Sequence, residues 1–181
     1  SSLPMQGWIG LLLIAVFWPL NWLLPGMRTH ALFFPLWLGY CLTVDGLVFL
    51  RKGTSLLTRS RARFVGLFLL SAPVWWLFEL LNARVQNWQY LGREQFTDLQ
   101  FFAVSTLNFT TVVPAVFGTA ELISTFIRRV RGPVIRSTPR TLATFFIAGL
   151  VMLALLLIWP RYFFPFLWLS VFFILEPANA A

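Results

Sequence analysis

The sequence has few charged residues, one cysteine and one histidine, and each shortage excludes a class of protein. Only 11% of its 181 residues are charged, whereas a soluble domain has about 25%. The single cysteine, Cys41, cannot form an intramolecular disulfide, a cysteine-cluster zinc site or an iron–sulfur site. The single histidine, His30, excludes a bis-histidine haem within the chain.

Motifs that mark catalysis or nucleotide binding are also lacking. The sequence contains no P-loop, HExxH zinc motif, dinucleotide-binding glycine pattern or calcium-binding loop. A Ser–His–acid triad would depend on His30 alone, and no serine lies in a G-x-S-x-G motif. The sequence therefore designates no catalytic, cofactor-binding or metal-binding residue, and we expect no cofactor.

What the chain does have is hydrophobic sequence, which makes up 59% of its residues and gives a mean hydropathy of +0.78. Apolar runs of about 17 to 20 residues recur, the length needed to cross roughly 30 Å of hydrocarbon. We predict an all-α, polytopic membrane bundle that forms one transmembrane domain over residues 1–181. Its six predicted spans, the last fading early as if truncated, are residues 8–24, 31–50, 64–82, 99–127, 142–159 and 162–176.

The basic residues alternate between the predicted loops. Residues 51–63 hold five arginines and lysines, residues 128–140 hold five more, and the other connections hold four. This positive-inside pattern predicts that both basic loops and the N-terminus are cytoplasmic and that residues 83–98 lie outside, in a bacterial inner membrane. Because the net charge of +8 lies in short loops and not on one face of a domain, nucleic-acid binding is not expected.

Four acids fall inside predicted spans, and each is a functional candidate by default, because an acid at the middle of a span costs about 2.5–3.5 kcal/mol. In the predicted orientation, Asp45, Glu121 and Glu176 lie at a similar depth near the cytoplasmic boundary, whereas Glu79 lies near the outer one. Arg51 and Arg128 follow two of these acids closely enough to curl back toward them. Pairing between helices, a proton or ion path, and a ligand or metal site are the alternatives.

Residues 75–92 mix polar groups with tryptophans at the outer end of the third span. Helical spacing places Glu79, Asn82 and Gln86 on one face, and keeps Arg84 too far round the helix to pair with Glu79. The candidate polar positions of the whole chain are Asp45, Glu79, Asn82, Arg84, Glu121 and Glu176. The candidate interface aromatics are Trp75, Trp76, Trp88 and Tyr90.

The fourth predicted span is too long for the hydrocarbon core, since residues 99–127 would extend about 43 Å. We predict a bend at Pro114, which cannot donate to the carbonyl of Thr110, with the hydroxyls of Thr110 and Thr111 supporting the loosened turn. A bend that shapes packing and a hinge for gating or binding are both possible interpretations.

Aromatic residues form 18% of the chain, and they either face lipid and other helices or line a groove for a carotenoid or quinone. His30 is expected in the outer loop, at the surface, with ligation of a chlorin or metal as the alternative. We expect a non-catalytic integral membrane subunit that packs laterally in a respiratory or photosynthetic electron-transfer complex. Its expected partners are membrane lipids, other integral subunits and a carotenoid or quinone. The alternative is a small membrane enzyme or transporter that acts on a lipid or isoprenoid through the intramembrane carboxylates.

Overall fold

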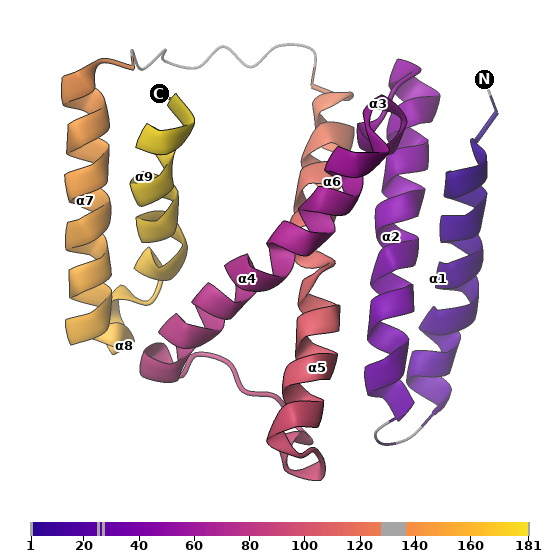
Figure 1. Cartoon of the computed structure of the whole chain (residues 1–181), viewed down its shortest axis with the longest axis horizontal. Coiled ribbons are helices and arrows are strands. Elements are labelled where there is room, and N and C mark those ends of the chain that lie inside the picture. The colour runs from indigo at the N-terminus through magenta and orange to yellow at the C-terminus, as the bar shows by residue number, and fades with distance from the viewer. Residues whose placement is uncertain (1, 25, 27, 128–136, 181) are drawn as a thin grey trace. The chain divides into compact units, whose positions relative to one another are not determined.

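The computed structural model describes residues 2–24, 26, 28–127 and 137–180, and these residues form helices and no strand (Figure 1). With 83% helix, the all-α prediction is confirmed. The chain forms two compact units: unit 1 is Ser1–Trp76 with Tyr90–Val130, and unit 2 is Leu77–Gln89 with Arg131–Ala181. That the whole chain is a single transmembrane domain stays a prediction.

Five segments of the described chain are long and apolar enough to cross a membrane, as expected of a multi-pass protein. They are α1 (Met5–Leu23), α2 (Arg28–Lys52), α4 (Arg61–Val85), the pair α5 (Asp98–Phe109) and α6 (Val112–Ser124), and α7 (Pro139–Ile158). Each overlaps one of the first five predicted spans, and the helix bounds differ from the predicted bounds by one to three residues. The sixth span and the side of the membrane on which the N-terminus lies stay predictions.

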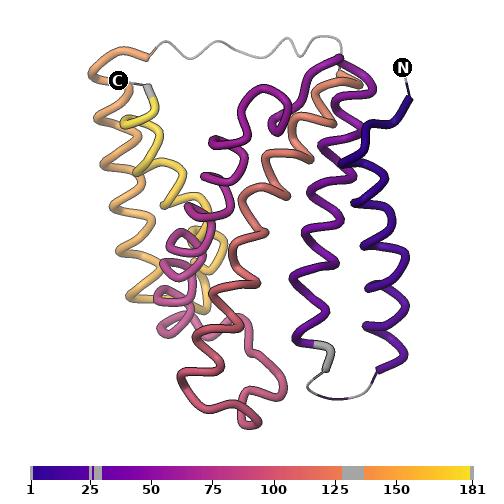
Figure 2. Tube along the Cα trace, turned by 45° about the vertical axis from the view of Figure 1, so that its right-hand side comes forward, coloured from indigo at the N-terminus to yellow at the C-terminus, as the bar shows by residue number. Residues whose placement is uncertain are grey.

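Unit 1 is built on an antiparallel pair, α1 and α2, which lie side by side (Figure 2). The two backbones approach closely because glycines face each other across the contact. A Cβ atom added to Gly10 would lie 2.5 Å from the backbone nitrogen of Thr43, and one added to Gly46 would lie 2.6 Å from the Cα atom of Gly7. Larger residues therefore cannot replace these glycines without separating the helices.

The long fourth span is broken where the sequence predicts a bend. Helix α5 ends at Phe109 and α6 begins at Val112, so that Pro114 lies in the first turn of α6, where a missing N–H group is tolerated. The Thr110 and Thr111 hydroxyls donate to the carbonyls of Leu107 and Asn108, at 2.6 and 2.8 Å. The break also bonds to α4, because the Ser71 hydroxyl donates to the carbonyl of Phe109.

The remaining elements of unit 1 lie at its two ends (Figure 1). One end holds the start of α1, the end of α2, the end of α6 and the short α3 (Leu56–Arg59). We call it the basic end, because residues 51–63 lie there. The other holds the start of α2, the start of α5 and the 3-10 turn η1 (Arg93–Gln95).

Unit 2 contains the last part of α4, α7, the short α8 (Pro160–Phe163) and α9 (Phe166–Ala180). The predicted sixth span began at residue 162, but the main helix begins only after Pro165, which interrupts the backbone hydrogen bonds. Helices α7 and α9 lie side by side (Figure 2). A Cβ atom added to Gly149 would lie 3.0 Å from the carbonyl oxygen of Ser170, which again indicates close backbone packing.

Candidate functional site

The Asp45 carboxylate holds the start of α3. Asp45 lies in α2, and its side chain is buried, with 3% of its surface exposed. One carboxylate oxygen accepts a hydrogen bond from the Ser55 hydroxyl at 2.7 Å, and the other accepts from the backbone N–H of Leu57 at 3.0 Å. Ser55 is itself the N-cap of α3. The buried acid therefore satisfies donors at a helix start, where the helix dipole also favours negative charge.

Glu121 in α6 is paired with the loop that follows α2. Both of its carboxylate oxygens accept from the Arg59 guanidinium, at 2.8 and 2.9 Å, and the Lys52 ammonium lies 3.5 Å away. The hydrogen bond from Arg59, helped by the negative charges of Glu121 and Asp45, raises the pKa of that guanidinium above its ordinary value. The sequence suggested Arg51 and Arg128 as partners of the intramembrane acids. Arg128 lies outside the described residues.

The end of α2 is bonded to the end of α6. The Arg51 guanidinium donates to the carbonyl and hydroxyl oxygens of Thr125 and stacks 3.8 Å from the ring centre of Phe126. Lys52 donates to the Ser124 hydroxyl at 3.3 Å. Cations at a helix C-terminus are stabilised by its free carbonyls. At the basic end of unit 1, Arg51, Lys52 and Arg59 are thus bonded to groups of the protein itself.

The second basic loop falls largely outside the description of the structure. Four of the five basic residues of this loop lie outside the described residues: Arg128, Arg129, Arg131 and Arg136. The fifth, Arg140, lies in the first turn of α7, in unit 2.

Within unit 2, the polar residues near the end of α4 form hydrogen bonds to the segment that directly follows the helix. The Asn82 amide donates to the Trp88 carbonyl at 2.9 Å, and its oxygen accepts from the backbone N–H groups of Asn87 and Trp88, at 3.0 and 3.3 Å. The indole N–H of Trp88 donates to the Glu79 carboxylate at 2.9 Å. Glu79, Asn82 and Trp88 therefore fix the reversal that follows α4.

The sequence placed Glu79, Asn82 and Gln86 on one helical face. For Gln86 this prediction is wrong, because Gln86 is not in the helix. Helix α4 ends at Val85, and Gln86 has a φ of +51°, a left-handed conformation that is common just after a helix and uncommon for residues other than glycine. Arg84 donates to the carbonyl of Ile158 at the end of α7, at 3.5 Å, and not to Glu79.

Glu176 is in the other unit from Asp45 and Glu121. It lies half-buried in α9 and makes no hydrogen bond or ion pair with a residue in the described part of the chain. Groups of three or more potential metal ligands are likewise absent from the described residues. Within the described residues, the acids thus form no arrangement that could hold a metal ion.

The four candidate aromatics divide between the two units. In unit 1, the indole of Trp76 donates to the Thr106 hydroxyl at 3.0 Å, which ties α4 to α5. Trp75 and Tyr90 line a cavity in the same unit. In unit 2, Trp88 lies 6.3 Å from Trp168, centre to centre, in a stacked arrangement.

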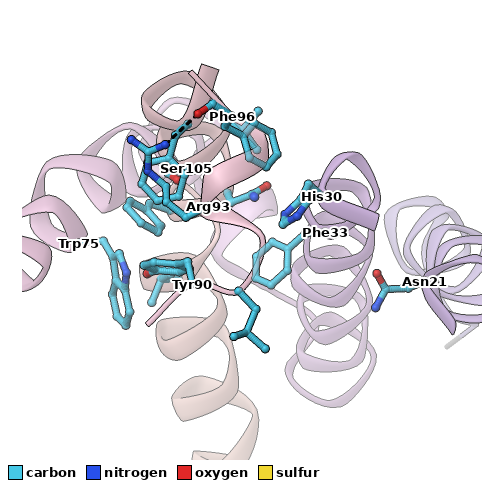
Figure 3. A pocket seen from close by; sticks show the side chains of 14 residues that line it. Asn21, His30, Phe33, Trp75, Tyr90, Arg93, Phe96 and Ser105 are labelled. Carbon is cyan, nitrogen blue, oxygen red and sulfur yellow. Dashed lines mark hydrogen bonds between the residues drawn. The ribbon is translucent and has the colours of Figure 1, made fainter. Parts of the chain in front are cut away.

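The cavity lies between α2, α4, α5 and the segment around η1, all in unit 1, and has a volume of about 400 Å³ (Figure 3). Its apolar walls carry the rings of Phe33, Trp75, Tyr90, Phe101 and Phe109. No aspartate or glutamate is among its lining residues in the described chain. Its polar lining residues are Asn21, His30, Arg93, Ser105 and Asn108.

The polar groups of the cavity differ in how they are satisfied. Arg93 donates to the carbonyl of Phe96 at 3.0 Å and pairs with Asp98. By contrast, the side chains of His30, Ser105 and Asn108 make no hydrogen bond within the described part of the chain. Sequence reasoning missed this cavity, because its walls come from residues as far apart as Asn21 and Val112.

His30 is not in a loop, as the sequence suggested, but in the first turn of α2. Its ring is half-buried and packs edge-on against Phe96, with 4.9 Å between ring centres.

Comparison with known proteins adds no family. No protein-family model, curated protein or solved structure matches this chain.

Proposed function

We propose that the protein is a non-catalytic, multi-pass subunit that packs laterally within a larger complex of a bacterial inner membrane, one of respiratory or photosynthetic electron transfer. The observation that carries the proposal is how the intramembrane acids are used. Asp45 caps α3, Glu121 pairs with Arg59, and Glu79 accepts from Trp88. Acids engaged in this way hold helices and turns together instead of meeting a substrate.

The outer faces of the helices support lipids and other membrane subunits as partners. Large aromatic rings are exposed on α1 and near α8, including Trp22 at 78% and Tyr162 at 76%. Exposed apolar surface of this kind is covered either by acyl chains or by neighbouring helices, and aromatic residues are enriched in protein interfaces.

The basic end supports a cytoplasmic position for the N-terminus and contact with anionic lipid. The amide of Gln6, next to the start of α1, lies 3.5 Å from Asp45, so the N-terminus of α1 shares this end with the basic residues. A groove of about 780 Å³ there is lined by Arg59 and Arg63 and by apolar residues such as Leu67 and Phe117. This arrangement suits a phosphate headgroup and its acyl chain. Six spans with the N-terminus inside are part of the proposal.

Purification of the native protein in mild detergent tests the proposal. We expect stoichiometric membrane partners on a gel, and a visible spectrum of haem or chlorin carried by those partners. An unrelated multi-pass protein of similar hydropathy, purified from the same membranes with the same tag, controls for nonspecific association. A pigmentless monomer that transports or converts a substrate would overturn the proposal.

The alternative, a lipid- or isoprenoid-directed enzyme or transporter, has less support because it needs Asp45, Glu121 and Glu79 to be available. It makes a separate prediction, namely that Asp45→Asn and Glu121→Gln abolish turnover while the protein still assembles. Unchanged function of the complex in well-folded variants would favour the subunit.

A further inference from the structure

The cavity of unit 1 has the size and walls of a binding site for a small ring. Its volume of about 400 Å³ falls within the range of roughly 300–1,000 Å³ typical of small-molecule sites. Phe33 and Tyr90 project into it from α2 and from the segment after α4, and Trp75 adds a third ring from α4 (Figure 3). Aromatic side chains favour stacking or edge contacts with a planar ligand ring.

The described residues around the cavity offer a cationic ligand no carboxylate and do not require an anionic ligand. The described lining residues include no carboxylate that could meet a cation. Arg93, the one permanent cation among the described lining residues, is already paired with Asp98 and stacks 4.4 Å from the ring centre of Phe101. A neutral ligand therefore avoids the cost of an uncompensated charge in an apolar setting.

The open hydrogen-bonding groups specify what such a ligand must offer. Ser105 and Asn108 are three residues apart on α5 and so lie on one face of the helix, while His30 comes from α2. A hydroxyl, an amide and an imidazole can each donate, and none of these side chains has a hydrogen-bond partner in the described part of the chain. Acceptor oxygens on a planar ring would satisfy donors on both helices.

A second, apolar groove adjoins the cavity. It lies between α1 and α2, has a volume of about 210 Å³ and shares Asn21 with the cavity. Its other lining residues are Ile14, Trp18, Trp22, Leu36, Trp37 and Tyr40. A hydrocarbon chain attached to the ring can run past Asn21 along this groove.

From these features we infer that the cavity binds the head of a membrane-soluble quinone, a neutral planar ring with two carbonyl oxygens and a hydrocarbon tail. Ser105, Asn108 and His30 donate to the carbonyl oxygens, and the rings of Phe33, Trp75 and Tyr90 enclose the head. The inference goes beyond the proposed subunit function and does not rest on it, because all the residues belong to this chain.

Binding of decylubiquinone to the purified full chain in mild detergent tests the inference, with tryptophan fluorescence as the signal, since quinones quench a nearby indole. We expect saturable quenching that is reduced in Trp75→Phe, because that indole lines the cavity. Asn108→Leu should weaken binding about tenfold through loss of a hydrogen bond. Ser105→Trp should abolish saturable binding by filling the cavity.

Four controls separate ring binding from other causes. Asn179→Leu, at an exposed position of α9 in unit 2, should leave the Kd unchanged. Thermal unfolding confirms that each variant is folded, and His30→Gln, which keeps a donor, should bind more tightly than His30→Leu. Farnesol, which has a tail but no quinone ring, should not compete.

Three results would overturn the inference. The first is absence of saturable quenching in the folded wild-type chain. The second is an equal Kd in the wild type, Asn108→Leu and Ser105→Trp, and the third is full competition by farnesol. Either of the last two would mean that decylubiquinone binds an apolar surface and not this cavity.

Discussion

The two ends of unit 1 carry similar polar side chains but use them in opposite ways. At the basic end, Asp45 and Glu121 bond to donors of the same chain, and Arg59 and Lys52 complete the network. At the cavity end, the side chains of Ser105 and Asn108 have no partner in the described part of the chain. A satisfied network indicates a structural role, whereas unsatisfied donors beside a cavity indicate a place for a ligand.

From the sequence, all the acids in predicted spans had the same status as functional candidates. The structure distinguishes them by the groups that they bond to. Every acid in a predicted span was a functional candidate by default. In the structure, Asp45 and Glu121 of unit 1 bond to groups of the same chain, and the strongest evidence for binding comes from the hydroxyl and amide donors beside the cavity. Substitutions at the two ends should therefore differ in what they change.

The largest effect is expected at Asp45. Asp45→Ala leaves the Ser55 hydroxyl and the Leu57 N–H without their acceptor in a buried place, at a cost of about 2–4 kcal/mol of unfolding free energy. Thermal and denaturant unfolding in detergent measure this loss, and limited proteolysis should cut residues 53–60 faster. Asp45→Asn, which keeps an acceptor and the volume, should lose less. Equal stability of wild type and Asp45→Ala would show that the network at the basic end is not structural.

A similar loss is expected at Asn82, which extends the comparison to unit 2. Asn82→Ala removes three hydrogen bonds that fix residues 87 and 88 after α4, and should cost about 2–3 kcal/mol. Asn179→Ala, at an exposed amide in α9, is the matched control and should have no measurable effect. If Asn82→Ala and Asn179→Ala both have the melting temperature of the wild type, the conformation of residues 87 and 88 does not depend on Asn82.

A smaller effect is expected at Glu121, since Arg59 and Lys52 are partly exposed and water screens the pair. Glu121→Gln should lower the unfolding free energy by about 1 kcal/mol. The raised pKa of Arg59 sets the pH dependence. Stability from a raised pKa is fully present below the unfolded value and is lost only above it, so the difference between variant and wild type should be the same at pH 7 and pH 10. A difference that disappears by pH 10 would contradict this assignment of the charge pair.

The helices were predictable from the sequence because apolar runs and proline positions act locally. The first five spans and the break near Pro114 follow from such signals. The contacts were not predictable to the same degree. Asp45 meets Ser55 only because the chain folds back over ten residues, although the S-x-x-T pattern of Ser55 and Thr58 is a visible capping signal.

The reversal at residue 86 and the cavity lie further from what periodicity can show. Nothing in the pattern marks Gln86 as left-handed, because glycine is the usual residue there. The cavity needs α2, α4 and α5 to be placed together, and spacing along one helix does not contain that information. The open donors are consequently visible only in three dimensions.

The smallest effect on stability is expected at the cavity end. Asn108→Leu and Ser105→Ala remove polar groups that have no partner in the described part of the chain, so no hydrogen bond is lost and the unfolding free energy should change by less than about 0.5 kcal/mol. Asp45→Ala, measured in the same detergent, provides the contrast. Should a saturating quinone raise the melting temperature of the wild type but not that of Asn108→Leu, the donors at this end serve the ligand. If Asn108→Leu instead destabilises the ligand-free protein as much as Asp45→Ala does, the two ends of unit 1 do not differ, since Asn108 would then belong to a structural network as well.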